Sequence, residues 1–173
     1  EERFRVGGVP VDRDEVIQHG LAVLDVFGVD DSSPRLTFFE LTTLMAVRIF
    51  ASHPEIDVCI YEVGLGGRLD ATNAIEPSLS VVTTIGLDHM AYLGDTIEAI
   101  AREKLAISRP GVPLVVGAQE HERRVGALLD GYDDVVRPSA VDEIGFTVED
   151  WGILRAPYQR AHFSTAVSAA SLW

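Results

Sequence analysis

The sequence predicts an α/β domain with a mainly parallel sheet flanked by helices. Short runs of apolar, β-branched residues alternate along the chain with segments of helical spacing, an order typical of parallel sheets. The apolar runs are nearly continuous, as expected for strands that helices cover on both faces. With 173 residues, 47% of them hydrophobic, the chain is long enough to bury a substantial core.

The first third of the chain is predicted to contain a hairpin and two helices. Two short runs separated by a pair of glycines predict the hairpin over 3–11. Apolar residues at helical spacing predict the first helix over 13–27. Thr37 and Glu40 have the spacing of a capping box, so the second helix is expected to begin at Thr37 and to end before Pro54.

The rest of the chain is predicted to alternate strands and helices. Asp95 and Glu98 have the spacing of a second capping box and are expected to open a helix. The expected strands are 57–63, 79–87, 112–118 and 133–138. The expected helices are 95–108, 121–131 and a last one from 158 onward, with a hairpin over 145–154.

Composition excludes several classes of function. The net charge is −13, which argues against nonspecific binding to nucleic acid or to an anionic membrane. Cys59 is the only cysteine, so no disulfide forms within the chain, and we expect it to be a small core residue. No run is long enough to span a membrane and the first residues are no signal peptide. We therefore expect a cytoplasmic domain.

Two predicted strands end in residues that could bind a metal ion. The strand over 57–63 carries Glu62 near its end, and the strand over 79–87 is followed by Asp88 and His89. Ligands of open α/β sheets bind beyond the carboxyl ends of the strands, and oxygen and nitrogen donors there could hold a divalent cation. The alternative is structural: Glu62 would pair with an arginine such as Arg68, and His89 would cap a backbone group.

Lys104 is the only lysine beside thirteen arginines, and its position on the predicted helix is informative. At 100° per residue, Lys104 falls within the apolar stripe of that helix, between Ile97 and Ile100. A buried ammonium is costly unless it is neutralised or paired. A paired or modified lysine and one that extends its charged end to solvent both fit this placement.

The glycines of the segment "GLGG", residues 64–67, do not form a dinucleotide-binding fingerprint. The G-x-G-x-x-G spacing is absent, and the following "RLDATN" is typical of a turn. We expect these glycines to let the backbone pass close to a ligand. The sequence also contains no G-x-x-x-x-G-K-[ST] loop that would cradle a phosphate.

Four segments resemble the signature segments of the folylpolyglutamate synthase / dihydrofolate synthase family, within the Mur ligase superfamily. They are "LTFFE" (36–40), "EVGLGGRLDATN" (62–73), "LDHMAYLG" (87–94) and "AREKLAI" (101–107). The similarity extends from "ERFRVGGVPV" to "YQRAHFSTAVSAA" and so covers most of the chain. The resemblance implies the central ATPase domain of a Mur-type ligase, which is an α/β fold.

The activity implied by the resemblance is ATP-dependent amide ligation. Enzymes of this family join L-glutamate to dihydropteroate or to the glutamate tail of a folate. ATP phosphorylates a substrate carboxylate, and the amine of glutamate attacks the resulting acyl phosphate. The implied cofactors are Mg²⁺ and ATP, the implied partners are these substrates, and the implied state is a cytoplasmic monomer.

The resemblance also assigns roles to individual residues. It implies that Glu62 and His89 are magnesium ligands, and that Lys104 reacts with CO2 to become a carbamate that faces the metal. His162 occupies the place of an asparagine near the nucleotide, which puts base or ribose recognition in doubt. The implied pterin-binding residues are Leu36, Thr37, Phe38 and Phe39 in the first segment and Leu69, Asp70 and Ala71 in the second.

Relative to this family, residues 1–173 are expected to form a single central domain that is incomplete at both ends. The family's phosphate loop precedes these segments and its carboxy-terminal domain follows them. We therefore expect these residues alone to bind ATP poorly and to show no ligase turnover. Two alternatives are another Mur-type ligase, acting on cell-wall precursors or cyanophycin, and a noncatalytic remnant.

Overall fold

A computed structural model describes residues 3–27, 36–118, 120–138 and 156–173. The chain divides into two compact units, Glu1–Gly64 and Leu65–Trp173. The hairpin predicted over 145–154 lies outside the described residues. In the part of the chain that the structure describes, no helix combines the length and the apolar character needed to cross a membrane.

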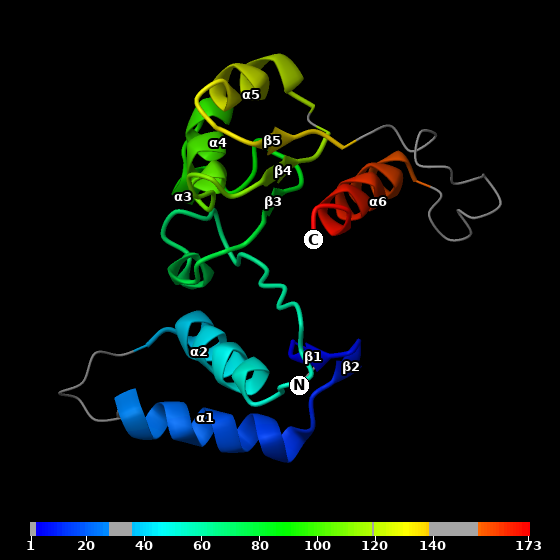
Figure 1. The fold of residues 1–173 in the computed structure, drawn as a ribbon. Coiled ribbons are helices and arrows are strands. Elements are labelled where there is room, and N and C mark those ends of the chain that lie inside the picture. Colours follow the sequence, from blue (N-terminus) through cyan, green and yellow to red (C-terminus); the bar gives the residue numbers. More distant parts are fainter. Residues whose placement is uncertain (1–2, 28–35, 119, 139–155) are drawn as a thin grey trace. The chain divides into compact units, whose positions relative to one another are not determined.

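The first unit consists of the predicted hairpin and two helices (Figure 1). Strands β1 (Arg5–Val6) and β2 (Val9–Pro10) pair antiparallel, and helix α1 (Arg13–Phe27) packs against helix α2 (Phe38–Ala51). Their apolar faces enclose one core, because burying these faces removes hydrocarbon from water. The buried residues of this core are Phe4, Val11, Val23, Met45, Ala46 and Ile49.

The capping box at the start of α2 is confirmed. The Glu40 N–H donates to Thr37 Oγ1 over 3.2 Å, and the Thr37 N–H donates to Glu40 Oε2 over 2.7 Å. These two bonds satisfy backbone donors that have no partner inside the helix. The helix ends at Ala51, before Pro54 as predicted.

The strand predicted over 57–63 is wrong. These residues belong to no sheet, and Ile60 is 87% exposed. Cys59, expected in the core, is exposed. An apolar run forms a strand only when a neighbouring strand satisfies its backbone groups, and the described residues of the first unit offer only the two-residue strands of the hairpin.

The second unit contains the predicted parallel sheet (Figure 1). Strands β3 (Ser80–Val82), β4 (Leu114–Val116) and β5 (Val135–Val136) lie in the order β3-β4-β5, and both pairs are parallel. The helices are α3 (Met90–Leu93), α4 (Ile97–Leu105), α5 (Glu122–Leu129), α6 (Pro157–Ala170) and the 3₁₀ helix η1 (Ala71–Ala74). The strands are shorter than predicted: β3 ends at Val82, not at residue 87.

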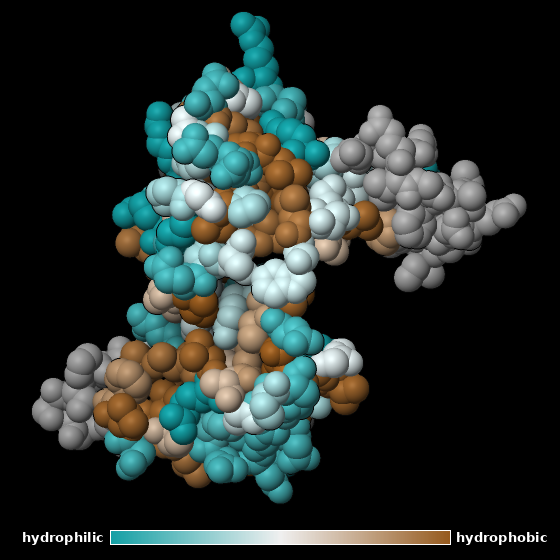
Figure 2. Space-filling model, viewed as in Figure 1, coloured by the Kyte–Doolittle hydropathy of each residue, from teal (hydrophilic) through white to brown (hydrophobic). Residues whose placement is uncertain are grey.

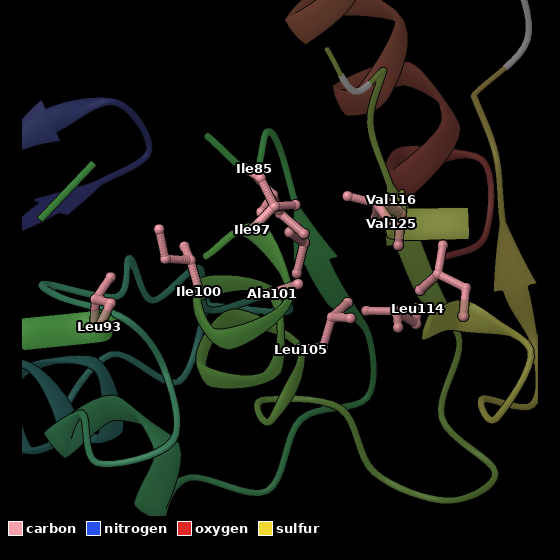
Figure 3. Packing of buried hydrophobic residues seen from close by; sticks show 11 residues of the cluster. Ile85, Leu93, Ile97, Ile100, Ala101, Leu105, Leu114, Val116 and Val125 are labelled. Carbon is pink, nitrogen blue, oxygen red and sulfur yellow. The ribbon is translucent and has the colours of Figure 1, made fainter. Parts of the chain in front are cut away.

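The core of the second unit lies between the sheet and helices α4 and α5 (Figure 3). Ile97, Ile100 and Ala101 on α4 are fully buried, as the predicted stripe requires. The predicted capping residues of α4 are wrong: Thr96 is the N-cap, and its Oγ1 accepts from the Ala99 N–H over 3.1 Å. A threonine one residue later than Asp95 meets the same geometric need.

Helix α6 covers the other side of the sheet from α4 and α5 (Figure 1). A Cβ atom on Gly117 would lie 2.4 Å from the carbonyl oxygen of Thr83 and 2.8 Å from Thr165 Oγ1, so only glycine fits between the residue after β3 and helix α6. Thr165 is buried at this contact, and the preceding Ser164 is buried as well. Hydrophobic residues reach the surface over α2 and over the sheet (Figure 2).

A histidine links α1 to the turn after α2 in the first unit. His53 Nε2 lies 2.9 Å from Glu15 Oε1, and His53 Nδ1 lies 2.8 Å from Glu55 Oε1. Hydrogen bonds with Glu55 and then Glu15 raise the pKa of His53 above 6.5. The bond with His53 lowers the pKa of Glu55 below 4.5. Protonated His53 therefore joins two carboxylates from different segments.

We expect this link to make the stability of the first unit depend on pH. Because the pKa of His53 is raised on folding, its contribution is fully present below pH 6.5 and is lost as the pH rises through the folded value. The Glu55 contribution is present above pH 4.5 and is lost as the pH falls through its folded value. In denaturant unfolding, the free energies of unfolding of His53→Gln and wild type should therefore differ most between pH 4.5 and pH 6.5.

His121→Gln provides the control, because the side chain of His121 makes no capping hydrogen bond at the start of α5. A His53→Gln difference that is equally large in alkaline solution would contradict the proposed ion pairs.

Candidate functional site

The glycine loop passes close to the end of helix α4. A Cβ on Gly67 would lie 2.7 Å from the carbonyl oxygen of Glu103, 2.8 Å from Ile107 Cγ2 and 3.1 Å from the carbonyl oxygen of Lys104. Gly66 has a φ of +69° and packs against Leu93. The backbone thus approaches α4 at Gly67 and the Leu93 side chain of α3 at Gly66, which provides a structural reason for both glycines.

Arg68 binds the same turn of α4 twice. Its backbone N–H donates to the carbonyl oxygen of Glu103 over 3.0 Å, and its Nε donates to Glu103 Oε1 over 2.9 Å. Arg68 therefore pairs with Glu103. The alternative to a metal-binding role, in which Glu62 would pair with Arg68, is not observed.

The carboxylate of Asp70 organises the turn that follows. Asp70 Oδ1 accepts from the Thr72 N–H over 2.9 Å and from Thr72 Oγ1 over 2.6 Å, and it caps η1. Asp70 Oδ2 accepts from the Leu65 N–H over 3.1 Å. Of the other predicted pterin-binding residues here, Leu69 is 80% exposed and Ala71 is half-buried.

Asn73 and Arg109 connect this loop to the residues after α4. Asn73 Nδ2 donates to the carbonyl oxygens of Arg68 over 3.1 Å and of Ala106 over 3.4 Å. Arg109 donates to the carbonyl oxygen of Asn73 over 2.7 Å, and to those of Ile107 and Ser108 over 3.3 and 3.2 Å. The loop and the end of α4 are therefore held together by side chains from both segments.

Lys104 lies in the last turn of α4 and is half-buried. Ile97 and Ile100, its neighbours on the predicted apolar stripe, are fully buried. The predicted buried face of α4 is therefore correct, and Lys104 lies at the carboxyl end of that face. Among the described residues, the side chain of Lys104 makes no hydrogen bond or ion pair. Its chemical role as a carbamate stays a prediction.

His89 follows the sheet in an unusual backbone conformation. Its φ of 51° is left-handed, and it is the N-cap of α3 without a side-chain capping bond, so the predicted capping alternative is not observed. The ring is exposed, with Nε2 3.5 Å from Asp88 Oδ2. The Asp88 carboxylate also accepts from the His89 N–H over 2.7 Å. Left-handed residues other than glycine are uncommon and occur often at functional sites.

Glu62 is exposed and belongs to the first unit, whereas His89 and Lys104 belong to the second. Within the described residues, no three His, Cys, Asp or Glu side chains are arranged to hold a metal ion. The predicted set contains two such residues and a lysine, so the metal site stays a prediction.

The predicted pterin-binding segment of the first unit surrounds the start of α2. Leu36 packs against the core and Thr37 caps the helix. Phe38 is 69% exposed, with the Arg3 guanidinium 5.9 Å from its ring centroid. Phe39 is half-buried, and its ring would lie 2.8 Å from a Cβ on Gly64. The two rings thus differ, one open to solvent and one against backbone.

His162 lies on the exposed side of the first turns of α6. Its ring is edge-on to Tyr158, with the ring centroids 6.3 Å apart. The roles of Asn73, Arg109 and Glu103 were not predicted. The Asp-x-Thr spacing around Asp70 indicates a local turn. The hydrogen bonds of Asn73, Arg109 and Glu103 instead join residues some thirty-five positions apart in the sequence, and no local pattern specifies such pairs.

Comparison with known proteins gives a consistent result, although no protein-family model matches the chain. A curated dihydrofolate synthase/folylpolyglutamate synthase of Buchnera aphidicola is 33% identical over 182 residues, covering 99% of this chain and 42% of that protein. The Escherichia coli enzyme of the same name is 51% identical over 117 residues, covering 67% of this chain and 28% of that protein.

Solved structures agree with the curated relatives. The apo form of L. casei FPGS superposes with a TM-score of 0.74 at 26% identity, covering 95% of this chain and 46% of that one. E. coli FolC in complex with DHPP and ADP gives 0.67 at 37% identity, covering 77% and 31%. A bifunctional folylpolyglutamate synthase/dihydrofolate synthase with Mn, AMPPNP and L-glutamate bound gives 0.62 at 35% identity, covering 77% and 31%.

The parallel sheet, its flanking helices and the loop docked on α4 define an α/β domain of the Mur-ligase type. Within that class, the chain belongs to the folylpolyglutamate synthase / dihydrofolate synthase family, as its four signature segments indicated. The chain spans less than half the length of these curated relatives.

The close approach at Gly67 predicts opposite effects for two glycine substitutions. Gly67→Ala should lower the free energy of unfolding by about 1–3 kcal/mol, because the new methyl group overlaps backbone and cannot be accommodated. Gly126→Ala is the control. Gly126 lies in α5 with no atom within 4 Å of the new Cβ, so this substitution should raise the free energy of unfolding by about 1 kcal/mol. Denaturant unfolding measures both; equal effects would refute the steric argument.

Proposed function

We propose that the full-length protein is an ATP-dependent ligase that joins L-glutamate to dihydropteroate, to the glutamate tail of a folate, or to both. The observation that carries this proposal is the match, over 99% of the chain, to a relative of that name. Structures of similar proteins contain ADP with DHPP, or Mn with AMPPNP and L-glutamate. These relatives favour folate-type substrates over cell-wall precursors or cyanophycin.

Glu62, His89 and Lys104 are the residues that would hold Mg²⁺. Their donor chemistry fits this ion if Lys104 is carbamylated, because two carboxylate groups and an imidazole then supply oxygen and nitrogen donors. Among the described residues, the side chains of Glu62 and Lys104 make no hydrogen bond or ion pair, and the exposed His89 ring has Asp88 Oδ2 3.5 Å from its Nε2. When bound, the magnesium neutralises the negative charge of the transferring phosphoryl group.

The proposed carbamate forms by addition of the lysine amine to CO2. The Nζ lone pair makes a new N–C bond, one C=O π pair moves onto oxygen, and an N–H proton leaves to water. The product is an N-carboxylate with one negative charge. This change turns the half-buried lysine from a competitor of the cation into a ligand for it.

The pterin site would use the two segments named by the resemblance, Leu36 to Phe39 and Leu69 to Ala71. An exposed ring such as Phe38 can stack on a flat heterocycle. A carboxylate such as that of Asp70 can accept hydrogen bonds from pterin N–H groups. His162, exposed on α6, would lie near the nucleotide.

The remaining parts of the proposal concern the whole protein. Residues 1–173 would be a central domain, with the phosphate loop and the glutamate-binding domain supplied by the rest of the full-length protein. That protein would be a cytoplasmic monomer that binds neither nucleic acid nor membrane, in keeping with the net charge of −13.

A substitution at Lys104 tests this function in the full-length protein. Lys104→Met removes the nitrogen that would carry the carbamate and keeps an unbranched side chain, so phosphate release with ATP, glutamate and dihydropteroate should fall by about 100-fold or more. Glu62→Gln should act in the same direction, because an amide oxygen binds Mg²⁺ more weakly than a carboxylate.

Arg102→Met is the matched control, since Arg102 lies on the exposed side of the same helix. Comparing dihydropteroate with a folate as the acceptor identifies which of the two is the substrate. Full activity of Lys104→Met, or turnover with a muramyl nucleotide alone, would refute the proposal.

A further inference from the structure

We propose that Arg68 and Asn73 are positioning residues that fix Lys104 by capping the carboxyl end of α4. This inference rests on the proposed function of Lys104 as a carbamate.

Two carbonyls at the end of α4 take their caps from a distant segment, while Ser108 caps the Leu105 carbonyl locally. The last carbonyl groups of a helix have no partner within it, and the two residues directly after α4, Ala106 and Ile107, are not the glycine of the common C-cap. The Arg68 N–H binds the carbonyl of Glu103, and Asn73 Nδ2 binds the carbonyl of Ala106. These two carbonyls flank Lys104 in the sequence: Glu103 directly precedes it, and Ala106 follows two residues later.

The contact between loop and helix is also closed sterically. Gly67 leaves no room for a Cβ against the carbonyls of Glu103 and Lys104. The helix end cannot approach the loop further, and the hydrogen bonds prevent it from moving away. The backbone of Lys104 is therefore held from both directions, although its side chain has a flexible four-carbon stem.

Charge gives Arg68 a second effect on Lys104. Arg68 neutralises the carboxylate of Glu103, the residue directly before Lys104, through the 2.9 Å ion pair. A carbamate on Lys104 would add a second negative charge to the same turn of α4. Without Arg68, repulsion between the two anions would disfavour the carbamate relative to the free amine.

Asn73 is itself held in place. It donates to the Arg68 carbonyl as well as to Ala106, and the Arg109 guanidinium donates to the Asn73 carbonyl over 2.7 Å. The loop therefore forms one connected unit with the end of α4, and losing the Asn73 amide would release the cap at Ala106.

The test measures the carbamate directly in the full-length protein. With ¹³C-labelled bicarbonate, the carbamate carbon gives its own NMR signal, and Lys104→Arg assigns it by removing it. The quantity compared is the bicarbonate concentration that gives half of the maximal signal. We expect Arg68→Gln and Asn73→Ala each to raise this concentration by about 10-fold, the range for residues that orient a ligand.

Arg124→Gln is the matched control. Arg124 makes a bidentate pair with Glu98 at the other end of the same helix, over 2.7 and 2.8 Å, so its loss removes a comparable ion pair away from Lys104. This variant should keep the wild-type half-saturation value. Arg68→Lys retains the positive charge near Glu103 and should shift the value less than Arg68→Gln, even where both variants lose similar thermal stability.

Two results would overturn the inference, and they are distinguishable. If Arg68→Gln and Asn73→Ala match Arg124→Gln while the wild type shows the carbamate, the positioning role is wrong and the proposed function stands. If the wild type shows no carbamate signal at saturating bicarbonate, the proposed chemistry of Lys104 fails, and the positioning role with it.

Discussion

The docking of the glycine loop on the last turn of α4 is the constraint on which the second unit depends. At Gly67 two backbones meet at a distance that excludes any side chain. Because the loop carries Asp70 and Asn73 and the helix carries Lys104, this single contact brings together residues from two signature segments.

Hydrogen bonds of ordinary strength are sufficient to maintain that contact because there are several and they involve backbone groups. The carbonyls at the end of α4 would otherwise require solvent or a local cap. Asn73, Arg68 and Arg109 supply the donors. The ion pair of Arg68 with Glu103 is partly exposed, and exposed pairs contribute little stability by themselves. Its effect is better understood as local charge control beside Lys104 than as a source of folding energy.

The fold and the site differ in how far the sequence predicts them. Helical spacing and the Thr37 capping box located α1 and α2 closely, because those signals arise from neighbours along the chain. The order of strands and helices around β4 followed from apolar runs for the same reason. The partners of Arg68 and Arg109 did not, because ion pairs and caps between distant segments leave no periodic signal. The choice of Thr96 over Asp95 as N-cap lies between these cases, since both residues can cap and one position separates them.

The segment 57–63 shows the limit of local patterns most clearly. Its residues have the propensity of a strand, yet Ile60 is almost fully exposed and no ladder forms. A parallel strand is stabilised by hydrogen bonds to neighbouring strands. The same residues therefore form a strand or a coil according to whether such a neighbour is present. Glu62 inherits this dependence, because its position follows from that segment. The positions of His89 and Lys104 do not depend on that segment. His89 is itself the left-handed residue that precedes α3, and Lys104 lies in the last turn of α4, so both are positioned within the second unit. Of the three predicted site residues, Glu62 thus lies in a segment without strand pairing, whereas His89 and Lys104 lie where hydrogen bonds within the second unit fix the backbone.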